Sequence, residues 1–202
     1  LDPLIALAAV AAVTNEIRLG TGVNILSQVN PLYLAKQAAS IDFVSKGRFM
    51  LGVGIGWMRE DFETLGVPYE RRGARFDDYL EAMRKVWSAE VVEHESEFLS
   101  WHGFKSRPLP IQTNLPVVIG GGRGKAFERT AKLGTGWYAP GWYDTRTGIK
   151  LLESHIEKLR IQCDQVDRDP SEIEITCMCL AVEGVSSSAS SRRLESDALS
   201  CL

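Results

Sequence analysis

The sequence predicts an α/β fold in which short parallel strands alternate with helices. Three adjoining stretches carry this prediction: an apolar strand at 17–26, an amphipathic helix at 30–47 and a second apolar strand at 48–57. A strand that returns to a parallel neighbour through a helix is a βαβ unit, and such units bind ligands at the carboxyl ends of their strands. Because the glycines of both strands gather at these ends, we expect the functional site there.

Composition limits the class of protein. The 202 residues are 45% hydrophobic and 24% charged, which is ordinary for one soluble globular domain. A net charge of −3 gives no electrostatic case for nucleic acid or an anionic membrane. No apolar run approaches the roughly 18–20 residues of a membrane span. The four cysteines show no CxxC or disulfide-like spacing and no signal peptide is visible, so we expect a reduced, cytoplasmic setting.

The N-terminal part begins with an expected helix at 3–14, ahead of the strand at 17–26. Asn30 is a natural N-cap and Pro31 a natural first-turn residue for the next helix. Apolar residues at intervals of three and four predict one buried stripe on that helix, made of Leu34, Ala38, Ile41 and Val44. Gly47 is suited to the C-cap.

Beyond Trp57, residues 58–73 read as a solvated segment before a long helix at about 73–88, with Arg75 among the residues of its wet face. Residues 90–107 alternate without a helical period, which predicts a β-hairpin or an irregular excursion over the exterior. Strands and helices then alternate; the expected ranges are 116–122, 125–133, 136–140, 146–166 and 172–182.

Residues 1–183 therefore form the expected domain, and residues 184–202 form a Ser-rich tail that we expect to be disordered. The pattern supplies about five strands, whereas a closed barrel of alternating strands and helices has eight and about 250 residues. The chain also opens directly in a helix with Leu1 in place of a methionine. We therefore treat it as a fragment of a larger fold.

The glycine clusters fail the standard nucleotide motifs. In residues 52–56 the spacing of a dinucleotide fingerprint would need a third glycine where Trp57 stands. Gly120, Gly121 and Gly122 lie between an apolar strand and a helix N-terminus, where free N–H groups and the helix dipole favour an anion. Such glycines can also simply make tight turns. Three clusters on three successive strands favour a shared ligand site.

No acid–base pair or metal site stands out. His94 lies in the expected excursion and His155 at an expected exposed helix position, so neither is a strong catalytic candidate. Cys177 and Cys179 share one face of a strand, which indicates core packing. The catalytic residues stay unassigned, and we expect no metal.

The chain resembles the luciferase-like flavin or deazaflavin oxidoreductases, a TIM-barrel superfamily. The resembling segments, in the family's order and spacing, are residues 17–23, 30–57, 70–87, 108–121 and 133–138. The LAKQ helix and the GVGIGW strand end look most like the branch that uses coenzyme F420. The resemblance implies an incomplete (β/α)8 barrel holding strands three to seven of eight. We expect this chain alone to be marginally stable, aggregation-prone or completed by residues outside this sequence.

The resemblance also implies site residues. Gly22 and Val23, with Asn24 beside them, match a bulge, often a non-prolyl cis peptide, on which the ring of the cofactor rests. Trp57 stands where sugar-phosphate dehydrogenases of the group carry an acidic residue, which implies an apolar or aromatic substrate here. The backbone donors for the cofactor phosphate match Gly120, Gly121 and Gly122.

The implied function is hydride transfer between F420 and a small organic molecule. One alternative is an FMN-dependent monooxygenase that uses reduced flavin and oxygen. A second is an inactive, truncated remnant of such an enzyme. The first helices are apolar enough to permit a homodimer.

Overall fold

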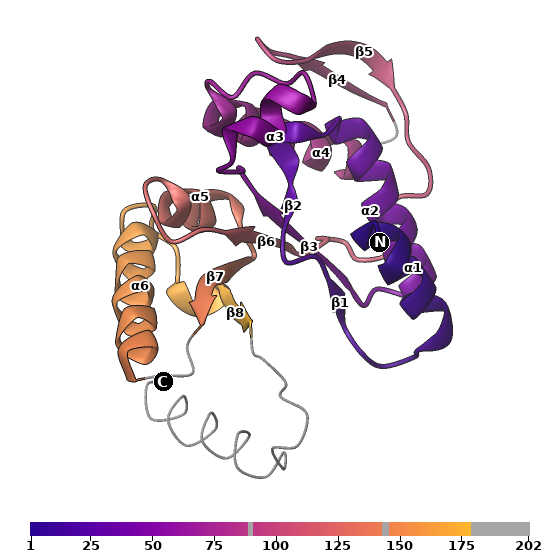
Figure 1. Ribbon diagram of the computed structural model, residues 1–202. Coiled ribbons are helices and arrows are strands. Elements are labelled where there is room, and N and C mark those ends of the chain that lie inside the picture. Colours follow the sequence, from indigo (N-terminus) through magenta and orange to yellow (C-terminus); the bar gives the residue numbers. More distant parts are fainter. Residues whose placement is uncertain (89–90, 143–145, 179–202) are drawn as a thin grey trace.

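The computed structural model describes residues 1–88, 91–142 and 146–178 (Figure 1). In this part of the chain a curled parallel sheet forms a half-barrel with helices packed on its outer side. The predicted class, an incomplete TIM-type α/β barrel, is confirmed. Residues 184–202 and Cys179, for which the sequence predicted a disordered tail and core packing, lie outside the described residues.

The sheet is organised around β3 (Phe49–Gly54). Two short pieces pair with one side of it, β1 (Leu19–Gly20) and β2 (Asn24–Ile25), and β6 (Val117–Gly120) pairs with the other. The sheet continues through β7 (Gly136–Trp142) and β8 (Glu174–Met178), and every neighbouring pair is parallel. The prediction of one continuous strand over 17–26 is therefore wrong, because residues 21–23 leave the ladder.

Curling of the sheet brings its first and last strands within reach of one ion pair. Arg18, directly before β1, binds the carboxylate of Glu174 in β8 with both Nη atoms, at 2.7 and 2.9 Å. Each side chain is about half exposed, so the pair adds little stability. It does show how far the parallel strands bend round between β1 and β8.

The helices follow the predicted order closely. Their bounds are α1 Pro3–Val13, α2 Pro31–Ser45, α3 Arg59–Thr64, α4 Arg72–Ser88, α5 Ala126–Leu133 and α6 Arg146–Asp164, with short 3-10 turns η1 Leu26–Gln28 and η2 Pro170–Glu172. Asn30 caps α2 as predicted, accepting from the N–H groups of Leu32 and Tyr33. At the other end Lys46 already takes a positive φ of 58°, one residue before Gly47.

In α2, α3 and α4, three residues differ from the predicted solvent exposure. The expected solvated segment contains α3, whose Phe62 is fully buried. Arg75 is buried, because its guanidinium donates to the carbonyl oxygens of Ser27 and Pro68 and so joins η1 to the turn ahead of α4. Val44 is 48% exposed, and the buried stripe of α2 continues through Asp42 and Ser45 instead.

The predicted hairpin is present and is attached to α4 by a buried histidine. It consists of β4 (Val92–Glu95) and β5 (Ser100–Phe104) in antiparallel pairing. His94 Nε2 lies 2.9 Å from Asp78 Oδ1, and its ring stacks on Trp101 at 4.8 Å. His94 is thus a structural contact rather than a surface residue.

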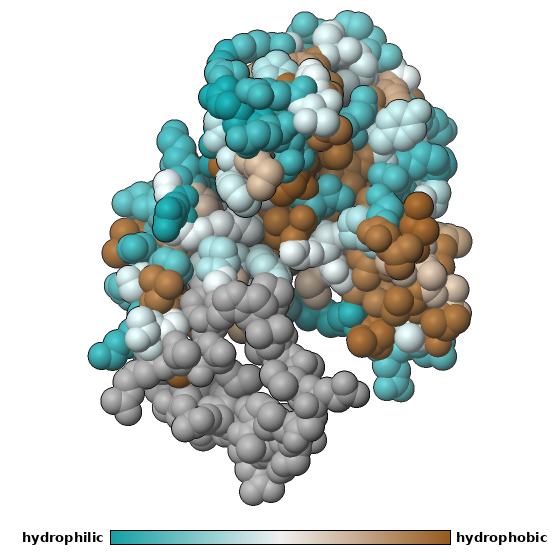
Figure 2. Space-filling model, viewed as in Figure 1, coloured by the Kyte–Doolittle hydropathy of each residue, from teal (hydrophilic) through white to brown (hydrophobic). Residues whose placement is uncertain are grey.

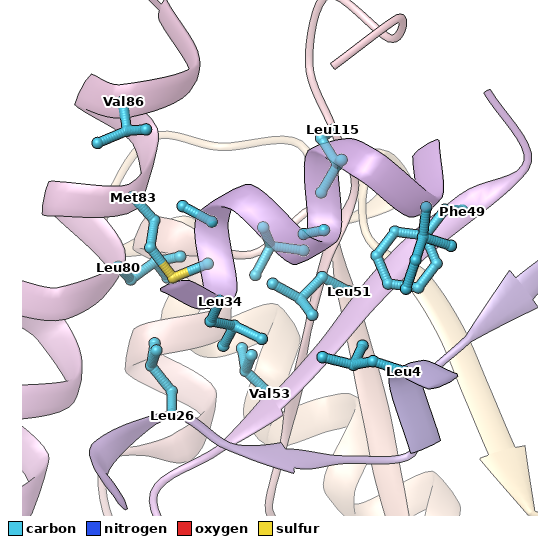
Figure 3. Close-up of a cluster of buried hydrophobic side chains, with 14 of the residues drawn as sticks. Leu4, Leu26, Leu34, Phe49, Leu51, Val53, Leu80, Met83, Val86 and Leu115 are labelled. Carbon is cyan, nitrogen blue, oxygen red and sulfur yellow. The ribbon is translucent and has the colours of Figure 1, made fainter. Parts of the chain in front are cut away.

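The main core lies between β3, α2 and α4 (Figure 3). Its side chains interdigitate from both helices and the strand; they include Leu34, Leu51, Val53, Leu80 and Met83. A second cluster under α5 and α6 contains Phe127, Trp137 and Leu159. The half-barrel therefore has two apolar clusters between its sheet and its helices.

A buried carboxylate ties the long crossing before β6 to the back of α2. Asp42 accepts from the backbone N–H groups of Ile111 (2.7 Å) and Gln112 (3.1 Å) and from the Gln112 amide (2.7 Å). Asp42 itself is fully buried. These bonds place the crossing so that β6 enters the sheet beside β3.

We expect Asp42→Ala to lower the free energy of unfolding by about 3 kcal/mol, because three donors to a buried carboxylate lose their acceptor. Urea unfolding followed by circular dichroism measures this. The control is Asp164→Ala, an exposed position, which should change stability by no more than about 0.5 kcal/mol. Equal unfolding midpoints for both variants would contradict the assignment.

Candidate cofactor site

The site is built where parallel strands end side by side. β2, β3, β6 and β7 are neighbours in the sheet, and their register sets Ile25 beside Gly54, Val53 beside Ile119 and Gly120 beside Tyr138. The predicted glycine-rich ends are therefore brought to one edge. This is the edge at which barrels of this type bind their ligands.

Residues 21–23 form the bulge that interrupts the first strand. The peptide bond between Gly22 and Val23 is cis, as the resemblance implied. Thr21 Oγ1 donates to the carbonyl oxygen of Gly52 at 2.7 Å. A Cβ on Gly52 would lie only 1.7 Å from the Thr21 carbonyl oxygen, so this approach requires glycine.

The side chain of Val23 fills the room that two of the glycines leave. A Cβ on Gly54 would come within 2.9 Å of Val23 Cγ2, and a Cβ on Gly120 within 2.9 Å of Val23 Cγ1. These two glycines therefore serve the packing of the bulge. The space over them, which the sequence suggested was open to a ligand, is occupied in part by Val23.

Tyr138 of β7 is a site residue that the sequence reading missed. Its ring atoms Cε2, Cζ and Oη would lie 3.0–3.2 Å from a Cβ on Gly22, so the phenol sits directly against the bulge. The sequence feature that could have revealed it is the strand end GWYAP, because it carries a tyrosine that pairs with Gly120 in the parallel sheet. Tyr138 adds a hydroxyl group to a surface otherwise made of backbone and Val23.

The loop between β6 and α5 is held from β7. Gly121 has a φ of 136°, its N–H donates to the Tyr138 carbonyl oxygen at 3.4 Å, and its carbonyl oxygen accepts from Trp137 Nε1 at 2.7 Å. The exposed side chains of Arg123 and Lys125 add positive charge where α5 begins. Glycine backbone and cationic side chains at a helix N-terminus suit an anionic group.

His155 of α6 lies under this loop, and its predicted exposure is wrong. It is 8% exposed and packs against Trp137 and Phe127 at ring distances of 5.9 and 5.5 Å. Its Cε1 atom would lie 3.0 Å from a Cβ on Gly122. Burial lowers the pKa of His155, with a smaller contribution from Lys158, so the ring supports the loop as a neutral imidazole.

The remaining predicted residues lie at the rim. Asn24 is in β2, beside Val53. Trp57 follows β3 with 78% of its surface exposed, and its carbonyl oxygen accepts from the Tyr69 hydroxyl at 3.2 Å. Within the described ranges no group of three or more His, Cys, Asp or Glu residues could hold a metal ion.

The fold is an incomplete TIM-type barrel in which a bulged strand and a glycine-rich loop lie at the carboxyl edge of the parallel sheet. A model of the luciferase-like monooxygenase family matches residues 1–196. The chain belongs to this family, whose members are oxidoreductases and monooxygenases.

Relatives extend the comparison. An uncharacterized protein of Mycobacterium tuberculosis is 38% identical over 155 residues, which are 76% of this chain and 55% of that protein. An FMNH(2)-dependent dimethylsulfone monooxygenase of Pseudomonas putida is 25% identical over 134 residues, 65% of this chain and 36% of its own. The chain thus spans about half, or less, of the length of these relatives.

The structure of the coenzyme F420 dependent tetrahydromethanopterin reductase of Methanopyrus kandleri superposes with a TM-score of 0.75 at 19% identity. The match covers 88% of this chain and 54% of that one, and it shows a shared fold. Among the described residues, no helix combines the length and apolar character needed to cross a membrane.

We expect Gly54→Ala to destabilise the protein by about 1–3 kcal/mol, because the new methyl group overlaps Val23. Val23→Ala in the same chain should recover part of that loss, since it removes the overlapping atom. A double-mutant cycle on unfolding free energies measures the coupling. Strictly additive effects would mean that Val23 does not occupy the room over Gly54.

Proposed function

We propose that the bulge and the glycine loop hold coenzyme F420, and that the protein transfers hydride between this cofactor and a small organic molecule. The observation that carries the proposal is the bulge at Gly22–Val23, which lies across the end of β3 from the loop at Gly120, Gly121 and Gly122. The deazaflavin supplies the hydride chemistry when it is bound.

The residues present fit such a group in two ways. Val23 and the backbone of the bulge offer a flat apolar support, against which Tyr138 is already packed. The loop at Gly121 and Gly122, with Arg123 nearby, offers backbone N–H groups and positive charge for an anionic tail. A ring and an anionic tail could therefore be held at once across neighbouring strand ends.

Trp57 forms the substrate side in this proposal. Its indole is exposed beyond the end of β3, and an apolar surface favours an apolar or aromatic substrate over a sugar phosphate. The catalytic residues stay unassigned. The proposed setting is the cytoplasm, and no nucleic acid or membrane is a proposed partner.

Two alternatives remain within the proposal. The likeness to the FMNH(2)-dependent monooxygenase of Pseudomonas putida supports FMN as the cofactor. The F420 dependence printed for the Methanopyrus reductase supports the deazaflavin. A truncated remnant without activity is the third possibility, and the binding experiment below separates it from the other two.

Fluorescence titration of the full protein with F420 and with FMN separates these readings. We expect F420 to bind at least about tenfold more tightly than FMN. Tighter binding of FMN would replace F420 in the proposal, and binding of neither would favour the remnant.

We expect Gly121→Ala to weaken F420 binding by about tenfold or more, because a side chain at φ 136° would lie 3.0 Å from the Ala126 Cβ and displace the loop. Gly103→Ala in the hairpin is the matched control. It also has a positive φ, of 66°, but nothing lies within 4 Å of the added Cβ. Equal affinities of the two variants would place the cofactor elsewhere.

We also propose that the protein forms a homodimer through α1 and α2. Figure 2 shows apolar side chains gathered over these helices, and the exposed ones include Ile5, Val13, Tyr33 and Phe43. A contiguous exposed apolar patch of this kind marks an interface.

Phe43→Lys should convert the dimer to monomer, because it places a charge in the buried contact. Sedimentation velocity on the full protein measures the change. Ile161→Lys, an exposed apolar position on α6, is the control and should leave the dimer intact. A monomeric parent protein would refute the proposal.

A further inference from the structure

A hollow lies at the opposite end of the strands from the glycine loop. Its volume is about 350 Å³, and its walls come from the C-terminal part of α4, the end of α5 and the residues directly before β6 and β7. Because parallel strands all run the same way, this is the amino-terminal edge of the half-barrel. It shares no residue with the proposed cofactor site.

The residues that line the hollow carry three positive charges and no carboxylate. The cations are Arg84 of α4, Lys132 of α5 and Arg168 from the turn after α6. Lys132 is bound to Glu128 at 2.7 Å and is half exposed, so its charge is largely compensated. Arg84 and Arg168 are therefore the two cations of the hollow whose presence needs an explanation.

Arg168 has a structural role that explains its presence. Its Nη1 donates to the carbonyl oxygens of Ala131 (2.9 Å), Gly134 (2.7 Å) and Thr130 (3.3 Å) at the end of α5, where helix carbonyl groups run out of intrahelical partners. Its Nε lies 3.3 Å from the carboxylate of the exposed Glu172. A cation here also faces the negative end of the helix dipole.

Arg84 is less fully accounted for. Its Nη2 donates to the Leu133 carbonyl oxygen, but no carboxylate among the described residues pairs with it. Burial lowers the pKa of Arg84, and the charge of Arg168 lowers it further. A partly buried guanidinium beside a like charge is costly unless a counter-charge is present.

Donor groups remain for such a counter-charge. Among the described residues, hydrogen-bond acceptors are found for Nη2 of Arg84 and for Nη1 and Nε of Arg168. Each guanidinium therefore keeps N–H groups that can bind a further acceptor. The side chains of Thr113 and Asn114, both exposed, stand on the same wall. Guanidinium groups present paired N–H donors that match the oxygens of phosphate.

We propose that this hollow binds an oxyanion of the phosphate type between Arg84 and Arg168. The ligand would be free phosphate or the phosphate group of a small metabolite. It would supply the missing counter-charge of Arg84 beside Arg168, join α4 to the end of α5, and occupy a site independent of the cofactor.

Calorimetric titration of the full protein with inorganic phosphate, at constant ionic strength set by chloride, tests the proposal. We expect saturable binding and a raised unfolding temperature relative to chloride alone. Arg84→Gln should weaken the phosphate affinity by about tenfold or more, since a charged hydrogen-bond partner is lost. Arg160→Gln is the matched control: this half-exposed arginine on α6 does not line the hollow and should leave the affinity unchanged.

A second variant and a second ligand complete the experiment. If Arg84→Gln unfolds the protein, Arg84→Lys, which keeps the charge but loses the fork, should bind phosphate with intermediate affinity. Glycerol 3-phosphate that binds at least as tightly as inorganic phosphate indicates a metabolite, and weaker binding indicates the free ion. The proposal is refuted if phosphate acts no differently from chloride, or if the folded Arg84 variants retain the parent affinity.

Discussion

The close approach of residues 21–23 to β3 is the constraint on which the candidate site depends. Gly52 must lack a side chain because the Thr21 carbonyl oxygen occupies the position of its Cβ. Gly54 and Gly120 must lack one because Val23 turns inward over both. The three contacts fix where the first strand leaves the ladder. They thereby fix which backbone atoms and which side chain, Tyr138, meet at the rim of the half-barrel.

The two edges of the parallel sheet expose different chemical groups. At the carboxyl ends the surface is made of glycine backbone, Val23 and aromatic rings, which suits a flat ring with an anionic tail. At the amino ends it is made of Arg84 and Arg168, drawn there by the free carbonyl groups at the end of α5. The amino edge thus carries two partly buried arginines, whereas the carboxyl edge combines glycine backbone and Val23 with the exposed cations Arg123 and Lys125 at the start of α5.

Buried polar contacts hold the elements that frame these edges. Asp42 fixes the crossing before β6, Arg75 joins η1 to the start of α4, and His94 attaches the hairpin to the same helix. Each group was read from the sequence as solvent-exposed or was not singled out. Periodicity assigns a charged residue to the wet face of a helix, but a nearby carbonyl or carboxylate in another segment can draw it inside.

The sequence by itself determined the order of helices and strands, the N-cap at Asn30 and the gathering of glycines at strand ends, because these follow from local patterns of apolar, capping and backbone-only residues. Only the tertiary structure decided that Val23 fills the room over Gly54 and Gly120, that Tyr138 lies against the bulge, and that His155 lies against the glycine loop. Those outcomes depend on which atoms of distant segments compete for one volume, and no local pattern encodes that competition.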